Sequence, residues 1–165
     1  MGVGFEVPFD KERLISCTYS LKKMRKELDD YAVTFTNYDR NATIAMVINH
    51  YSNARGIECI GMTARTPSYQ ISLPFSSDKM AMYDILRRIR HMFGINLDLS
   101  GLERDSKQQV SDFEKSIKKL CTDNPELAPQ ITIYMEQVEK GFEEFPFKEP
   151  TTIPDVFLKE FGDSL

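Results

Sequence analysis

The chain has 165 residues, of which 41% are hydrophobic and 28% charged, a composition typical of a soluble globular domain long enough to bury a core. No apolar run approaches the ~18 residues of a membrane span, and 25 acidic against 21 basic residues argue against general nucleic-acid binding. The start of the chain lacks the pattern of a signal peptide, so we expect a cytoplasmic protein.

The charge is unevenly spread along the chain. Residues 1–100 hold 13 basic and 11 acidic residues (+2), whereas residues 101–165 hold 8 and 14 (−6). We therefore expect a partial α/β core over 1–100, an acidic antiparallel helical hairpin over 101–145, and a loop with a closing helix over 146–165.

Strands and helices are predicted to alternate in the first part of the chain. The predicted elements are, in order, a strand over 13–19, a helix from Ser20 to Tyr31, a strand over 32–35, a helix over 42–55 that stops at Gly56, and a strand over 57–63. In the last strand, odd- and even-numbered positions both carry apolar residues, as expected for a strand covered on both faces. Alternation of this kind predicts right-handed crossovers and a parallel sheet.

The helix over 42–55 is predicted to be amphipathic. Its apolar stripe consists of Ile44, Val47, Ile48 and Tyr51. Asn41 stands where a helix N-cap is preferred.

The second part of the chain is predicted to be helical. The predicted helices cover 80–93 with a stop at Gly94, 101–121, a segment opened by Asn124 and Pro125, and 154–161. The second and third of these are joined by a short turn, which favours an antiparallel hairpin. Ser76 or Ser77 is the expected N-cap of the first.

Three strands are few for an α/β sheet, since sheets usually have about four to six. Either the chain is the C-terminal portion of a larger domain or a partner completes the sheet.

Four residues are candidates for an anion or nucleotide site. Arg40 and Asn41 lie in the turn before the helix over 42–55, where helix amides can meet an anion, although an N-cap with solvated charges is the simpler explanation of the pattern. Arg65 and Tyr69 follow the third predicted strand and form a possible binding lip.

Metal, cofactor and nucleophilic chemistry have little support in the sequence. No carboxylate or cysteine stands three or four residues after His50 or His91, so no metal site is expected. The three cysteines are expected to be buried, reduced thiols. No Gly-x-Ser-x-Gly elbow and no glycine-rich phosphate loop is present, so no catalytic residue and no cofactor are predicted.

A basic face on the helix over 80–93 allows two interpretations. It is formed by Lys79, Arg87, Arg88 and Arg90. A solvated helix surface is expected, and pairing with the acidic hairpin is the alternative.

Two stretches carry a resemblance to a known family. GIECIGMTARTPSYQIS (residues 56–72) and SSDKMAMYDILRRIRHMFGINLDLSGLE (76–103) resemble the prokaryotic members of the proteasome assembly chaperone family. The acidic hairpin and the terminal IPDVFLKEF are similar to that family's helical insert and closing helix.

The resemblance implies a nucleoside-phosphorylase-like three-layer α/β fold, with the family's earlier strands missing and without phosphorylase catalytic residues. It also implies a chaperone-like role, because relatives of this family act as dimeric chaperones of proteasome α-subunits. Two departures stand against a direct transfer. The family's Gly-Pro turn is replaced by residues 39–42 (Asp-Arg-Asn-Ala), and the chain ends in Asp-Ser-Leu rather than in the docking tail of some relatives.

The sequence thus leaves two functions open. The first is a non-catalytic module that binds proteins, including proteasome subunits or itself as a homo-oligomer. The alternative is a nucleotide- or phosphate-binding enzyme that uses the phosphorylase-like crevice.

Overall fold

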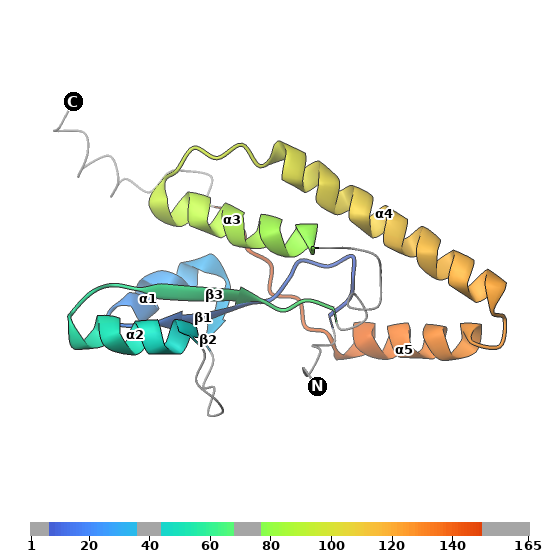
Figure 1. The fold of residues 1–165 in the computed structure, drawn as a ribbon, viewed down its shortest axis with the longest axis horizontal. Coiled ribbons are helices and arrows are strands. Elements are labelled where there is room, and N and C mark those ends of the chain that lie inside the picture. Colours follow the sequence, from blue (N-terminus) through green and yellow to red (C-terminus); the bar gives the residue numbers. More distant parts are fainter. Residues whose placement is uncertain (1–6, 36–43, 68–76, 150–165) are drawn as a thin grey trace.

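The structure is a computed structural model that describes residues 7–35, 44–67 and 77–149. Within these residues the chain folds as an α/β protein with a small mixed sheet of three strands, five α-helices and a helical C-terminal region (Figure 1). In chain order the elements are β1 (Ile15–Tyr19), α1 (Met24–Leu28), the short 3₁₀ helix η1 (Asp29–Tyr31), β2 (Val33–Phe35), α2 (Ile44–Ala54), β3 (Ile60–Ala64), α3 (Lys79–Phe93), α4 (Ser100–Asp123) and α5 (Ala128–Gly141).

The sheet has the order β2-β1-β3 and is mixed rather than parallel. β1 and β2 are parallel, as expected, with Ile15 opposite Val33. The prediction of a parallel third strand is wrong, because β3 runs antiparallel to β1 with Ile15 opposite Ala64.

The direction of α2 explains this difference. Asn49 of α2 contacts Thr18 of β1, and Asn53, one turn later, contacts Ser20, so α2 runs in the same direction as β1. A short turn at Gly56, which adopts a positive φ of 68°, then returns the chain as β3. Alternation of strand and helix predicts the order of elements but does not fix the direction in which the helix runs.

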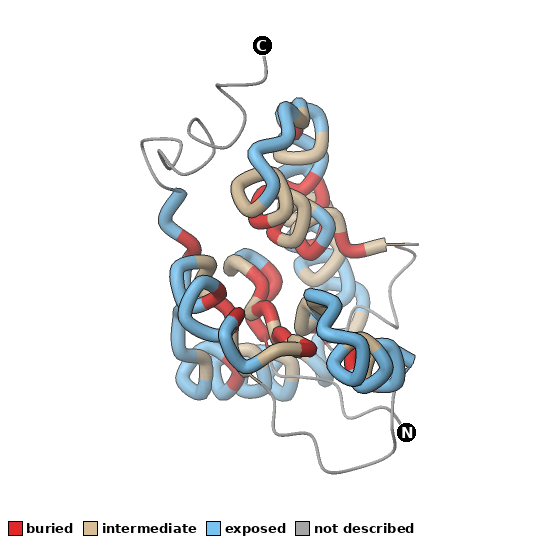
Figure 2. The backbone as a smooth tube through the Cα atoms, turned by 90° about the vertical axis from the view of Figure 1, so that its left-hand side faces the viewer, coloured by how far each residue is buried: buried red, intermediate tan, exposed pale blue. Residues whose placement is uncertain are grey.

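The buried apolar core lies on one face of the sheet. Its centre is formed by five residues of β1, α1 and β2: Ile15, Cys17, Met24, Leu28 and Val33. α3 closes this face with Ile85 and Met92, and Figure 2 shows the buried residues gathered around the sheet and the helix above it. The opposite face of the sheet carries Thr18 and Gly61, on which α2 lies.

The predicted helix from Ser20 to Tyr31 is shorter in the structure, where α1 covers Met24–Leu28 and η1 follows. Ser20 is used differently from the expected cap. Its hydroxyl donates to the carbonyl of Ile57 (2.7 Å) and accepts from the amide of Cys59 (2.9 Å). The side chain therefore ties the end of β1 to the segment that leads into β3.

The ends of α3 confirm one prediction and correct another. Gly94 ends the helix with a positive φ of 57°, as expected. The N-cap is Asp78, whose side chain accepts from the amide of Ala81 (3.0 Å), and not Ser77. Ser76 lies outside the described residues, as does the predicted helix over 154–161.

The C-terminal helices run in opposite directions, with α4 packed along α3 and α5 returning below it (Figure 1). The N-terminal segment inserts between them. Phe9 stacks on Phe113 of α4 with ring centroids 4.0 Å apart.

Candidate functional site

The basic face of α3 is buried rather than solvated. Arg88 is fully buried and Arg87 is 9% exposed, so the prediction of a solvated face is wrong for these two residues. Arg88 donates to the carbonyls of Tyr31 and Asp84 and to the Glu12 carboxylate, each at 2.8 Å. Apart from Asp84 of the same helix, its partners come from the N-terminal segment and from η1, and not from the acidic hairpin.

A second buried arginine anchors the N-terminal segment. The Nε of Arg13 donates to Asp78 (2.9 Å), and the same guanidinium reaches the backbone carbonyls of Pro8 and Phe9 (both 3.0 Å). The amide of Arg13 donates to the carboxylate of Asp84 (2.7 Å). We call these residues the charge cluster: Glu12, Arg13, Asp78, Asp84, Arg87 and Arg88.

Burial dominates the electrostatics of the charge cluster. It raises the pKa of Asp84 to about 6 and lowers the pKa of Arg88. The cluster contains three acids and three arginines, so its formal charges balance. Since its hydrogen bonds join residues 8–13, η1 and α3, its role is to hold these segments together.

α2 has a different arrangement, because its one buried residue is polar and its apolar stripe is exposed. Asn49 is buried and donates to the hydroxyl of Thr18 (2.8 Å), and Asn53, which is exposed, donates to the carbonyl of Ser20. The predicted apolar stripe is exposed: Ile44 by 79%, Val47 by 43%, Ile48 by 50% and Tyr51 by 58%.

Exposed apolar side chains also occur on α3, which like α2 contacts β3, and before β3 itself. On the other side of the sheet α3 exposes Met82 and Phe93, and Ile57 is exposed before β3 begins. In Figure 1 β3 lies in front of β1 and β2, with α3 above it and α2 below it. We call this region the edge surface; it comprises β3 and the side chains of Ile44, Val47, Ile48, Tyr51, Ile57, Met82 and Phe93.

Of the four predicted ligand residues, the structure describes one. Arg65 follows β3 and its amide donates to the carbonyl of Leu14 (2.9 Å). It therefore lies beside the start of β1, whereas β1 and β2 end at the opposite end of the sheet. Arg40, Asn41 and Tyr69 lie outside the described residues.

Arg65 lines a cavity of about 620 Å³ between the sheet and the segment that follows α5. The wall includes apolar side chains such as Val33 and Phe145 and two carboxylates, Asp29 and Glu143.

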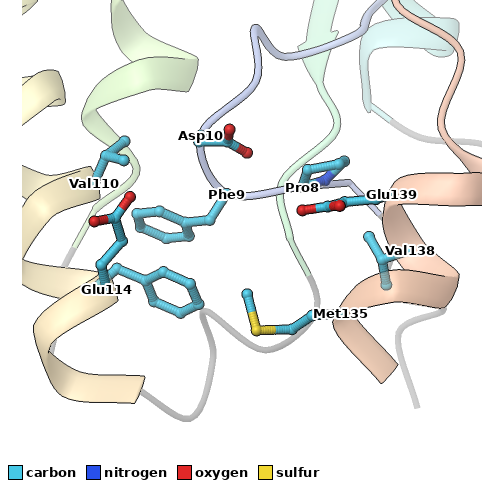
Figure 3. A pocket seen from close by; sticks show the side chains of 9 residues that line it. Pro8, Phe9, Asp10, Val110, Glu114, Met135, Val138 and Glu139 are labelled. Atoms are coloured by element: carbon cyan, nitrogen blue, oxygen red, sulfur yellow. The ribbon is translucent and has the colours of Figure 1, made fainter. Parts of the chain in front are cut away.

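A smaller cavity of about 140 Å³ lies between α4 and α5, and Phe9 and Phe113 are among the residues that line it. Figure 3 shows Phe9 of the N-terminal segment between side chains of the two helices. Asp10, Glu114 and Glu139 are at its rim. It is closed on one side by the inserted N-terminal segment.

The cysteines are free thiols, as expected, but only Cys17 is buried, whereas Cys59 and Cys121 are half-buried. Burial raises the pKa of Cys17 to about 11. His91 lies 3.0 Å from the carboxylate of Glu149. No group of three or more metal-ligating side chains occurs in the part of the chain that the structure describes.

Among the described helices, none has both the length and the apolar character needed to cross a membrane. Comparisons with known proteins give no relative. No protein-family model, no curated protein and no solved structure matches this chain.

The sequence predicts the wrong environment for the arginines of the charge cluster, which are buried, and does not predict that the apolar stripe of α2 is exposed. The cluster has a signal in the sequence, since Asp84 stands three and four residues before Arg87 and Arg88 on one helix face. The edge surface also has a signal in the sequence, because the eleven residues of α2 include no Lys, Arg, Asp or Glu.

Proposed function

We propose that the chain is a non-catalytic protein-binding and oligomerising module that acts through the edge surface. The observation that carries this proposal is the orientation of α2, which seats its asparagines on the sheet and exposes Ile44, Ile48 and Tyr51. A partner that covers these apolar side chains removes them from water, and each Å² of apolar surface buried stabilises the complex by about 25 cal/mol.

The partners that fit such a surface are other proteins or further copies of this chain. The resemblance to assembly chaperones adds proteasome subunits as a class to be tested. Nucleic acid, membrane and cofactor have no part in the proposal, and the cytoplasm is the proposed location.

The test is photocrosslinking in cells that express the chain. A photoreactive phenylalanine analogue replaces Ile48, and in a matched control it replaces Lys118, on α4 and away from the edge surface. The proposal expects a discrete crosslinked protein band from position 48 and none from position 118. Equal or absent crosslinking at the two positions would overturn it.

The alternative, a nucleotide- or phosphate-binding enzyme, has one observation in its favour. The cavity beside Arg65 has a volume of about 620 Å³, within the ~300–1,000 Å³ range of ligand pockets. Asp29 and Glu143 also line it, and their negative charge opposes an anion there.

A thermal-shift panel of nucleotides and inorganic phosphate separates the two functions. A ligand at a hundred times its dissociation constant stabilises a protein by ~2.7 kcal/mol. The module proposal expects no shift with any ligand. A shift that disappears in Arg65→Ala would favour the alternative.

A further inference from the structure

The outer edge of β3 has no strand beside it among the described residues, since the sheet order is β2-β1-β3. The amide of Ser20 bonds to the carbonyl of Cys59, and the amide of Arg65 bonds to the carbonyl of Leu14. In an antiparallel pair the bonding direction alternates from residue to residue. The backbone groups of Ile60, Met62 and Ala64 therefore point away from β1.

An edge of this kind is a template for another strand. Natural sheets protect such edges with charge, proline or a covering element. β3 has the sequence IGMTA, with no charge and no proline, and apolar side chains of α2 and α3 flank it.

We propose that a second copy of this chain occupies the edge surface, its β3 pairing antiparallel with the β3 of the first copy across a twofold axis at Met62. This inference rests on the proposed function and names the partner of the same surface. The pairing places Ile60 opposite Ala64 of the other copy and Met62 opposite itself, and it joins two three-stranded sheets into one of six strands.

The position of α2 fits this arrangement. α2 contacts both β1 and β3, through Thr18 and Gly61, so its axis lies between the two strands. With strands ~4.8 Å apart, a helix midway between β1 and β3 is ~5 Å from the twofold axis, and the two copies of α2 are ~10 Å apart. Packed helices have interaxial distances of about 8–10 Å.

The apolar stripes are self-complementary about the same axis. When two copies of α2 pack antiparallel, Ile44 of one copy lies opposite Tyr51 of the other, and Val47 lies opposite Ile48. A twofold interface requires self-complementarity of this kind.

Charge and area also favour a second copy. α2 has no Lys, Arg, Asp or Glu, so two copies meet without repulsion. The seven exposed side chains, at roughly 200 Å² each when fully exposed, leave on the order of 750 Å² open to water. This is close to the ~800 Å² that each partner of a standard interface buries.

The first test is the mass of the purified full chain by sedimentation velocity. The wild type is expected at twice the 19.1 kDa of the chain, and Ile48→Asp at 19.1 kDa. Ile133→Asp is the matched control, because Ile133 is 55% exposed on α5, away from β3, and this variant is expected to remain a dimer. A monomeric wild type, or a dimer that survives Ile48→Asp but not Ile133→Asp, would overturn the proposal.

The second test is amide hydrogen exchange read residue by residue. The Met62 amide is expected to exchange at least tenfold more slowly in the wild type than in Ile48→Asp. The Thr63 amide points toward β1 and is the internal control for folding, protected in both. Unprotected Met62 in a dimeric wild type would place the interface elsewhere and overturn the pairing of β3.

These outcomes separate this inference from the proposed function. A monomeric wild type whose position 48 still crosslinks to another protein would overturn the second copy and leave the proposed function standing. A monomeric wild type with no crosslink at position 48 would overturn both. A monomeric wild type that Ile48→Asp strongly destabilises would show that the chain's own residues cover α2.

Discussion

α2 and α3 lie on opposite faces of the same small sheet and have inverted patterns. α3 buries charge, with Arg88 fully enclosed among Glu12, Asp84 and backbone carbonyls. α2 buries asparagine and exposes isoleucine and tyrosine. The difference shows that an apolar stripe in a sequence does not by itself mark the side of a helix that faces its own sheet.

The charge cluster is expected to show the larger effects, because the loss of a buried arginine leaves several buried acceptors with fewer donors. Arg88→Ala removes donors from Glu12 and from three carbonyls, and we expect it to lower the free energy of unfolding by about 3–5 kcal/mol. Urea denaturation followed by circular dichroism measures this loss. Arg104→Ala, at an exposed arginine of α4, is the control and should stay within ~0.5 kcal/mol of wild type. Equal effects of the two substitutions would mean that the cluster does not hold the fold.

Asp84 is expected to give this region a measurable pH dependence. Burial raises its pKa to about 6 in the folded protein, above the ordinary 3.8. The folded state therefore holds the proton more tightly than the unfolded state. This contribution is fully present below pH ~4 and is lost as the pH rises through about 6, by about 3 kcal/mol at 1.36 kcal/mol per pKa unit.

The measurement is the difference in unfolding free energy between wild type and Asp84→Asn at several pH values. Subtracting the unfolding free energy of Asp84→Asn from that of the wild type removes the contribution of the other carboxylates. The result should fall by about 3 kcal/mol between pH 4 and pH 7. A difference that rises with pH would show that the neighbouring arginines outweigh burial.

The packing of α2 against the sheet can be tested with a substitution at Gly61. A Cβ at this position would lie 2.7 Å from the hydroxyl oxygen of Thr18 and 3.4 Å from the Cβ of Ala45. Gly61→Ala should therefore displace the Thr18 hydroxyl, to which Asn49 of α2 donates, and cost about 1–3 kcal/mol in thermal or urea unfolding. Gly101→Ala in α4 has no atom within 4 Å of the new Cβ and should be neutral or stabilising, by up to ~1 kcal/mol. If both substitutions changed the unfolding free energy in the same direction, the close packing around Gly61 would be contradicted.

Cys17 gives the smallest effect. Its burial and raised pKa of about 11 should keep it unreactive toward a thiol reagent at pH 7.5, while Cys59 and Cys121 are labelled. Mass spectrometry of the labelled peptides reads this out. Labelling of Cys17 at the rate of Cys121 would indicate that the sheet opens readily under native conditions.

Periodicity predicted most of the elements in the described residues, including α3 with its stop at Gly94. Local signals of this kind depend on neighbours within one or two turns. The direction of β3 could not be predicted, because it depends on the direction of α2, which contacts between Asn49 and Thr18 and between Asn53 and Ser20 reveal.

The candidate site was predicted less well, for a related reason. The apolar stripe of α2 was found, but a stripe alone does not say whether sheet or solvent lies against it. The arginines of α3 were assigned to the surface because their partner Glu12 lies more than seventy residues earlier. Pairings over such distances leave no periodic trace in a single sequence.

The most direct test of the central claim, that α2 packs its apolar face against a second copy of the chain, uses the absence of tryptophan from this chain. Tyr51→Trp places a tryptophan on the exposed stripe, the only one in the chain, and its emission is distinct from that of the six remaining tyrosines. The account predicts a blue-shifted emission maximum for this variant and for Tyr51→Trp with Ile133→Asp. It predicts a red-shifted, solvent-exposed maximum for Tyr51→Trp with Ile44→Asp. The same emission maximum in all three proteins would contradict the claim.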